Sequence, residues 1–73
     1  NNYVDLFDRN LKEIPNYIQF NIVNRYFSCA NNQLTSLKGC PKIVHGKFWC
    51  YNKVEFTKED VIKLCDVKDS VFV

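Results

Sequence analysis

The sequence predicts a small α/β solenoid of about three parallel strands, stacked one on another and closed at its C-terminal end by a helix and a strand. Three observations predict this fold. A strand-like segment recurs at a spacing of 21 to 23 residues. A similar return segment follows two of the copies. Residues 57–73 then depart from the repeat and read as a short helix followed by a strand.

The most complete copy of the repeat begins at Phe27. Phe27 and Cys29 alternate with polar or small residues, as in a strand with one buried face. Asn32 follows, and Leu34 and Leu37 come two and five residues after it, a spacing that neither a strand nor a regular helix produces. This is the spacing of leucine-rich repeats, in which a short strand leads into a corner and the asparagine bonds the backbone of the turn. One such unit cannot bury its own apolar face, so it needs neighbouring copies.

Two further copies flank this one. Residues 48–52 repeat residues 27–31 at an offset of 21, with Phe, Cys and Asn in register. Residues 4–6, followed by Leu11 and Ile14, fit the template at an offset of 23. Only the middle copy is complete, because Arg9 occupies the asparagine position of the first copy and Asn52 comes one residue early in the third.

The run Leu-Thr-Ser-Leu-Lys-Gly-Cys-Pro at 34–41 resembles the short, proline-containing leucine-rich repeats of bacterial effectors. Together with Gly-x-Phe-x-Cys at 46–50, it is still more similar to small repeat proteins encoded by tailed bacteriophages. The resemblance covers residues 4–56. It implies a short leucine-rich-repeat-like solenoid and a small viral accessory protein that acts in the bacterial cytoplasm by engaging a host protein.

Length and composition fit one folded domain. The chain has 73 residues, of which 47% are hydrophobic and 15% aromatic, a composition that favours a packed core over disorder. The net charge of +2 is small for a dedicated nucleic-acid or anionic-membrane binder. No apolar run approaches the roughly 20 residues that cross a membrane. Because the chain starts at Asn1 without methionine, we expect a fragment or a trimmed product.

The four cysteines admit three interpretations. Cys29 and Cys50 share the inward positions of neighbouring strands, about 5 Å apart, where disulfide geometry is rarely good. We therefore expect buried thiols that pack as small apolar groups in a reducing, cytosolic setting. A disulfide framework and a zinc site remain alternatives, although no C-x-x-C pair supports the latter. The zinc site would combine Cys29, Cys40, Cys50, Cys65 and His45.

The connections and the C-terminal end complete the expected fold. Residues 16–23 are expected to cross behind the sheet with a short helix or 3₁₀ turn, and Gly46 is expected to adopt a positive φ. Thr57, followed by acidic residues, reads as the N-cap of a two-turn helix. The apolar face of that helix is expected to comprise Val61, Leu64 and Cys65, and a closing strand is expected at 71–73.

The sequence predicts a binding protein and not an enzyme, with no cofactor. The single histidine has no nucleophile motif beside it, and no Gly-rich phosphate loop is visible. Instead, five aromatic residues fall among the nine outward positions of the expected strands, and aromatic residues on a rigid open face are the usual anchors of protein interfaces. The outward positions are Tyr3, Asp5, Phe7, Tyr26, Ser28, Ala30, Lys47, Trp49 and Tyr51.

The predicted partner-binding site lies on this face, which is the concave face if the sheet curves as in longer solenoids. Trp49, flanked by Tyr51 and Tyr26, is its expected centre. The full set of candidate residues is Trp49, Tyr51, Tyr26, Phe7, Tyr3, Asp5, Lys47 and Arg25. The alternative is that the aromatic residues are covered within the chain, by the N-terminal arm or by the closing strand.

Two other functions remain open. The aromatic face could stack single-stranded nucleic acid, but its cations are few, so nucleic acid is not the expected partner. They are Lys47, Lys53, Arg25 and Lys42. Alternatively the protein is a structural module that associates with itself through open sheet edges.

Overall fold

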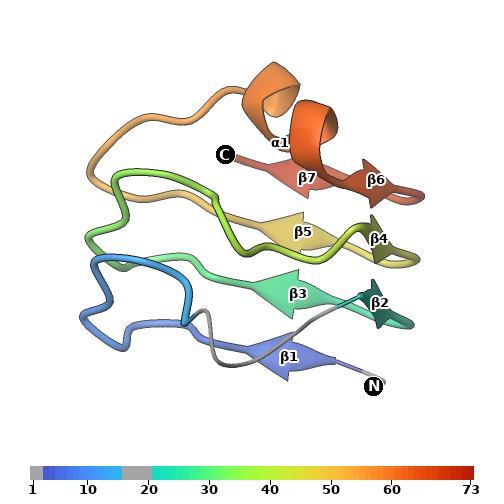
Figure 1. Cartoon of the computed structure of the whole chain (residues 1–73), viewed down its shortest axis with the longest axis horizontal. Helices are drawn as coiled ribbons and strands as arrows, with labels where there is room; N and C mark the ends of the chain where they lie inside the picture. Colours follow the sequence, from blue (N-terminus) through green and yellow to red (C-terminus); the bar gives the residue numbers. More distant parts are fainter. Residues whose placement is uncertain (1–2, 16–20) are drawn as a thin grey trace.

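The computed structural model describes residues 3–15 and 21–73, which form a small α/β structure with two parallel sheets and one short helix (Figure 1). The four-stranded sheet has the order β1 (Val4–Asp5), β3 (Phe27–Ser28), β5 (Phe48–Trp49) and β7 (Val71–Phe72). The three-stranded sheet has the order β2 (Ile22–Val23), β4 (Ile43–Val44) and β6 (Asp66–Val67). Helix α1 (Lys58–Leu64) lies between β5 and β6 in the sequence.

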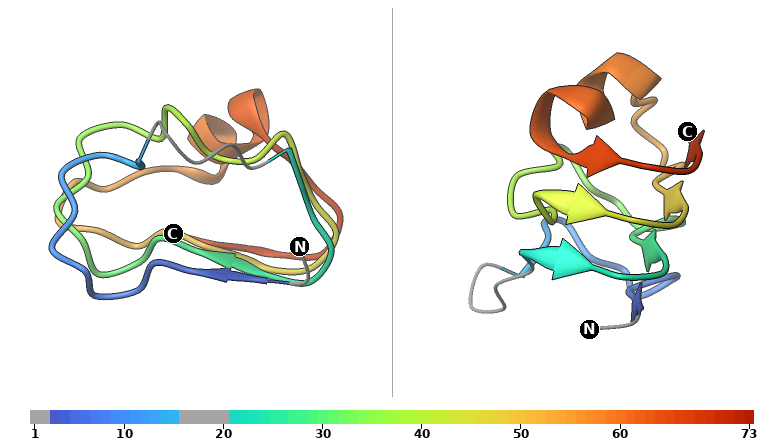
Figure 2. Two further views of the ribbon diagram at one scale, coloured as in Figure 1. Left: turned by 60° about the horizontal axis from the view of Figure 1, so that its bottom comes forward. Right: turned by 90° about the vertical axis from the view of Figure 1, so that its right-hand side faces the viewer.

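The chain passes from the four-stranded sheet to the three-stranded sheet and back again. We call each such passage a circuit, and successive circuits lie over one another (Figure 2). Phe27 pairs with Val4 on one side and with Phe48 on the other, in the register expected from the repeat spacing. The predicted parallel pairing is therefore confirmed. The four-stranded sheet has one strand more than expected, because Val71 pairs with Phe48 and the C-terminal strand continues the sheet.

The second sheet was not predicted. Residues 16–20 of the expected crossover helix lie outside the described residues, but the remainder of that segment contains strand β2. Val23 is completely buried while Ile22 is 49% exposed, the alternation of a strand. The second crossover likewise contains β4, whose Ile43 pairs with Ile22. Each crossover thus adds a strand to the sheet at the opposite side of the core.

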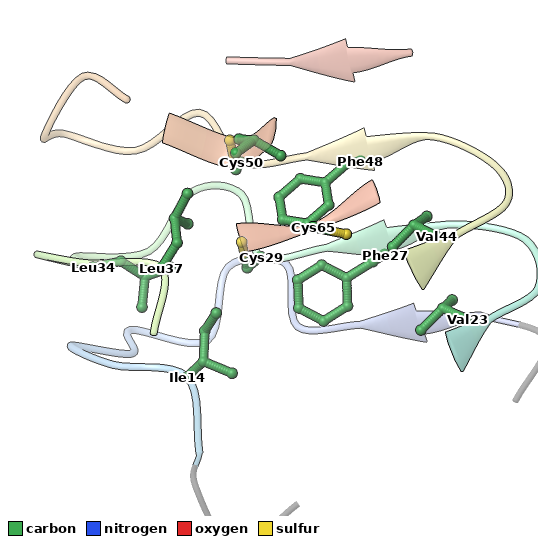
Figure 3. Close-up of a cluster of buried hydrophobic side chains, with 11 residues drawn as sticks. Ile14, Val23, Phe27, Cys29, Leu34, Leu37, Val44, Phe48, Cys50 and Cys65 are labelled. Carbon is green, nitrogen blue, oxygen red and sulfur yellow. The ribbon is translucent and has the colours of Figure 1, made fainter. Parts of the chain in front are cut away.

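The core lies between the two sheets and is closed by the return segments (Figure 3). Phe27 and Phe48 are fully buried, and their ring centroids are 5.1 Å apart. Cys29 and Cys50 are also fully buried, which confirms the inward positions predicted for these four residues. The other members of the buried cluster are Ile14, Val23, Leu34, Leu37, Val44, Val61 and Cys65.

Asn32 joins two circuits through its buried side-chain amide. The amide oxygen accepts hydrogen bonds from the backbone N–H groups of Arg9 and Leu11, each at 2.9 Å. The amide nitrogen donates to the carbonyl oxygens of Leu6, Cys29 and Ala30. The corner at Arg9 is therefore held by the asparagine of the next circuit, and an asparagine of its own is not needed for these bonds.

Asn52 does the same one circuit later, although it comes a residue early in the repeat. Its amide oxygen accepts from the N–H groups of Asn32 and Leu34, and its nitrogen donates to the carbonyls of Cys29 and Cys50. The middle copy has one more residue at this corner, and Asn31 there adopts a left-handed backbone with φ of 56°. The irregular spacing therefore leaves the amide bonds between circuits intact.

Gly46 does not adopt the positive φ expected of it, since Gly39 is the glycine with φ of 95° in the described chain. Gly46 is required for a different reason. A Cβ atom at this position would lie 1.8 Å from the carbonyl oxygen of Arg25, far inside any allowed contact. The corners of two successive circuits therefore approach each other too closely for any side chain at position 46.

Helix α1 begins as predicted and ends with a different buried face. Thr57 accepts from the Asp60 N–H, and the Asp60 carboxylate accepts from the Thr57 N–H, forming a complete capping box. Val61 and Cys65 point into the core, but Leu64 is 52% exposed, so its assignment to the buried face was wrong. Val61 and Cys65 are four positions apart and therefore lie on the same side of the helix, which faces the core. Leu64 lies to one side of that line.

Helix α1 is too short to cross a membrane, and the described residues contain no other candidate span.

Candidate functional site

The outward face of the four-stranded sheet carries one residue of each strand in a continuous row. Asp5, Ser28, Trp49 and Phe72 are aligned by the register of the sheet, one strand apart. Each is the neighbour of a residue that points into the core, and strand alternation turns it outward. Neighbouring strands lie about 4.8 Å apart, so neighbouring side chains in one row are within reach of each other.

Two pairs of aromatic rings stack on this face. The rings of Trp49 and Phe72 are 4.0 Å apart between centroids, with an interplanar angle of 13°. Those of Tyr3 and Tyr26 are 5.1 Å apart at 22°. We call the surface formed by these four residues, with Phe7 and Tyr51, the aromatic face. Its members on the outer strands remain open to solvent, since Tyr3 is 57% exposed.

The structure gathers four of the eight candidate residues around one hollow at the corner where the chain enters β3 and β5. This hollow has a volume of about 510 Å³. Tyr26 and Trp49 line it from the aromatic face, and Arg25 and Lys47 line it from the corner. The remaining lining residues are Asn24, Gly46 and Asp69. We call it the corner hollow.

Gly46 lies in the lining of the corner hollow. The repeat spacing places Gly46 between Arg25 of the preceding circuit and Asp69 of the following one. The Arg25 carbonyl occupies the space that a Cβ atom at position 46 would take, so no side chain lies between those of Arg25 and Asp69 in this row. Neither Arg25 nor Lys47 forms an ion pair with any other residue described. The hollow therefore has an aromatic wall, one carboxylate and two cations that have no ion-pair partner in the described segments.

The other four candidates do not join this hollow. Tyr51 lies toward the opposite end of the strands, where it lines a polar hollow of about 530 Å³ together with Asn52. Phe7 and Asp5 are on the edge strand, and the Asp5 carboxylate accepts a hydrogen bond of 3.0 Å from the Phe7 N–H. Tyr3 is linked to the corner hollow only through its stack with Tyr26.

Ser28 and Ala30 were expected to be open to solvent and are not. Ser28 is 7% exposed and Ala30 is fully buried. Both are small residues of β3 and its extension, set between larger side chains of the flanking strands, which cover them. The middle of the sheet therefore offers little surface of its own, and the accessible aromatic groups belong to the strands on either side.

Phe72 and Asp69 belong to this region but were missed in the sequence. Phe72 stands 23 residues after Trp49, which is within the repeat spacing. The alternation of Val71, Phe72 and Val73 would have turned Phe72 outward beside Trp49. Interpreting residues 57–73 only as a terminal cap concealed this continuation of the sheet.

The cysteines provide no reactive centre at neutral pH. All four thiols are free, and burial raises the pKa of Cys50 and Cys65 to about 12 and that of Cys40 to about 11. Burial also raises the pKa of Cys29. Across residues 3–15 and 21–73, no group of three or more His, Cys, Asp or Glu side chains is placed to hold a metal ion.

No family model, curated protein sequence or solved structure is significantly similar to this chain.

Proposed function

We propose that this chain is a short leucine-rich-repeat-like solenoid that binds another protein through the aromatic face, with Trp49 at the centre of the contact. The observation that carries the proposal is the pair of ring stacks on that face. The resemblance to bacteriophage repeat proteins adds that the partner is a host protein and that binding takes place in the bacterial cytoplasm.

Ring stacking favours binding because it fixes the anchors in advance. Trp49 is held against Phe72 at 4.0 Å, so little side-chain entropy remains to be lost when a partner docks. Buried aromatic side chains contribute much of the energy of protein interfaces. Tyr51 and Phe7, each 45% exposed, extend the same surface toward the far end of the strands.

Stacking also has an internal role, which the test must separate from binding. Trp49 could serve only to cover the sheet, and then its loss would change stability alone. The partner would be sought by passing bacterial lysate over immobilised wild-type protein and over Trp49→Ala and Tyr51→Ala in parallel. Circular dichroism of each variant shows whether it is folded. The matched control is Ile62→Ala, which removes a side chain that is 63% exposed on α1.

A protein retained in stoichiometric amount by wild type and by Ile62→Ala, but lost with folded Trp49→Ala or Tyr51→Ala, is the expected result. If the folded variants retain the same protein as wild type, the aromatic face is not the binding site. If nothing is retained and the apparent mass of the purified protein rises with concentration, the protein is a self-association module. Retention of nucleic acid that weakens steeply with salt would instead identify a single-strand binder.

A further inference from the structure

We infer that the corner hollow receives an extended acidic segment of the partner, in which a flat apolar side chain lies next to a carboxylate. This inference rests on the proposed function, since it names the chemistry that the same face would recognise. It commits to one arrangement: the apolar side chain packs against Trp49 in the corner hollow, and the carboxylate lies between Lys47 and Arg25.

The size and wall of the hollow suit a side chain. Its volume of about 510 Å³ lies within the range of small-ligand sites, which extends from about 300 to 1,000 Å³. The glycine in its lining is obligatory, because a Cβ atom at position 46 would lie 1.8 Å from the Arg25 carbonyl oxygen. No substitution at position 46 can therefore fill the hollow without separating the stacked corners.

Trp49 can contact the apolar side chain of the partner segment. One face of its indole lies against Phe72, and the residue is partly exposed, so part of the ring remains open to a ligand. Its indole N–H donates to no acceptor among the described residues. A planar or branched apolar side chain can therefore pack on the ring while a backbone carbonyl of the same segment accepts the indole proton.

The charges select an anion and fix its direction. Lys47 and Arg25 contribute two positive charges without ion-pair partners among the described residues, against the one negative charge of Asp69. The repeat places Asp69 on the far side of Gly46 from Arg25. A ligand carboxylate is therefore attracted to the Arg25 side and repelled from the Asp69 side, so an acidic segment would bind in one orientation.

The test uses Trp49 as its own probe, because it is the single tryptophan of the chain. Its fluorescence would be titrated with two blocked peptides that differ only in charge, acetyl-Ala-Glu-Phe-Glu-Ala-amide and acetyl-Ala-Lys-Phe-Lys-Ala-amide. We expect the acidic peptide to bind at least about fivefold more tightly, a ratio that corresponds to about 1 kcal/mol for exposed charges. Raising the salt concentration should reduce the difference.

Variants identify the groups responsible. Lys47→Glu and Arg25→Glu should each weaken binding of the acidic peptide about fivefold, and Asp69→Asn should strengthen it. Lys38→Glu makes the same change of net charge at an exposed position in the return segment, outside the lining of the hollow. It should leave the affinity within about twofold of wild type.

Equal affinity for the two peptides, no saturable change with either, or an equal loss with Lys38→Glu and Lys47→Glu would each overturn the inference. The host protein distinguishes this failure from failure of the proposed function. If Trp49→Ala loses that protein while the double variant of Arg25→Glu and Lys47→Glu retains it, the face binds a protein but the acidic segment is wrong. If wild type retains no protein, the proposed function itself fails.

Discussion

At the residue scale, one buried polar side chain links two circuits of the chain. Asn32 is 4% exposed and makes five hydrogen bonds through its amide, to backbone groups on two circuits. Without the amide, the N–H groups of Arg9 and Leu11 and the carbonyl of Leu6 would lose this partner, whereas the carbonyls of Cys29 and Ala30 also accept from the Asn52 side chain and the Asp8 N–H. Buried polar groups without partners are costly, so the asparagine controls the stability of both corners.

We expect Asn32→Ala to lower the free energy of unfolding by about 2–4 kcal/mol, because two backbone N–H groups and one carbonyl in partly buried positions lose their partner together. Urea unfolding followed by circular dichroism measures the change. Gln33→Ala is the matched control, since its side chain is exposed, and it should cost less than about 0.5 kcal/mol. Similar midpoints for the two variants would show that water replaces the Asn32 amide.

The cysteines make stability depend on alkaline pH. Burial raises the pKa of Cys50 and Cys65 to about 12 in the folded chain, whereas an unfolded thiol has a pKa of about 8.5. Between these values the folded state holds more protons than the unfolded state, so stability is complete below about pH 8.5 and falls as the pH rises toward 12.

Thermal unfolding measured at steps from pH 8 to pH 11 should therefore show a falling midpoint. Cys65→Ala should show a smaller fall over the same range, because it removes one of the buried thiols. At pH 8 the native thiols should react slowly with a disulfide reagent and rapidly once the chain is unfolded, since the thiolate is the reactive form. Rapid reaction of all four thiols in the folded protein would contradict their burial.

At the scale of elements, the stacking of corners sets a strict requirement at one glycine. Gly46→Ala places a Cβ atom 1.8 Å from the Arg25 carbonyl oxygen, and this neighbour is backbone, which cannot turn aside as a flexible side chain could. We expect a loss of about 3 kcal/mol or more in unfolding free energy, or no folded protein, because the corners would have to separate. Urea unfolding and expression as soluble protein give the measurement.

Gly39→Ala is the informative comparison. Gly39 has φ of 95°, which disfavours a side chain, but its nearest neighbours would lie at an ordinary 3.5 Å. This substitution should cost about 1–2 kcal/mol. If Gly39→Ala proves the more damaging of the two, then backbone conformation and not the approach of the corners dominates at these glycines.

The elements also show which parts of the fold the sequence could predict. Strands at Val4, Phe27 and Phe48 were predictable because a repeated pattern reinforces a weak local signal. The two-residue strands β2 and β4 were not, since Ile22–Val23 and Ile43–Val44 are too short to show alternation. Their identity as strands comes from pairing with one another across the stack, which is a property of neighbours and not of the segment.

The candidate site, like the fold, could be predicted from the sequence only in part. Alternation along the strands predicted which aromatic residues turn outward, including Trp49 and Tyr26. Together with the repeat spacing it also puts Phe72 beside Trp49, but it could not predict that the two rings stack at 4.0 Å, or that the corner hollow separates Arg25 and Lys47 from Tyr51. Those facts depend on the number of circuits and on the close approach at Gly46, which local patterns do not encode.

At the scale of the whole molecule, no circuit can be stable alone. Every paired strand in both sheets joins segments at least 20 residues apart, as Val4 with Phe27 and Ile22 with Ile43. The core is shared between circuits, and the amides of Asn32 and Asn52 bond one circuit to the next. Loss of any circuit therefore exposes core and leaves backbone groups unpaired in its neighbour.

This coupling predicts a single cooperative unfolding transition. Trp49 fluorescence reports the end of the stack at β5 and β7, whereas far-UV circular dichroism reports both sheets. In urea the two signals should change at the same midpoint, and that midpoint should not depend on protein concentration if the chain folds as a monomer. A dichroism change that precedes the fluorescence change would show instead that the circuits containing β1 and β2 unfold separately, as in longer arrays whose cooperativity breaks down. In that case the aromatic face near Trp49 would survive on a partly folded chain, and binding would have to be measured below the first transition.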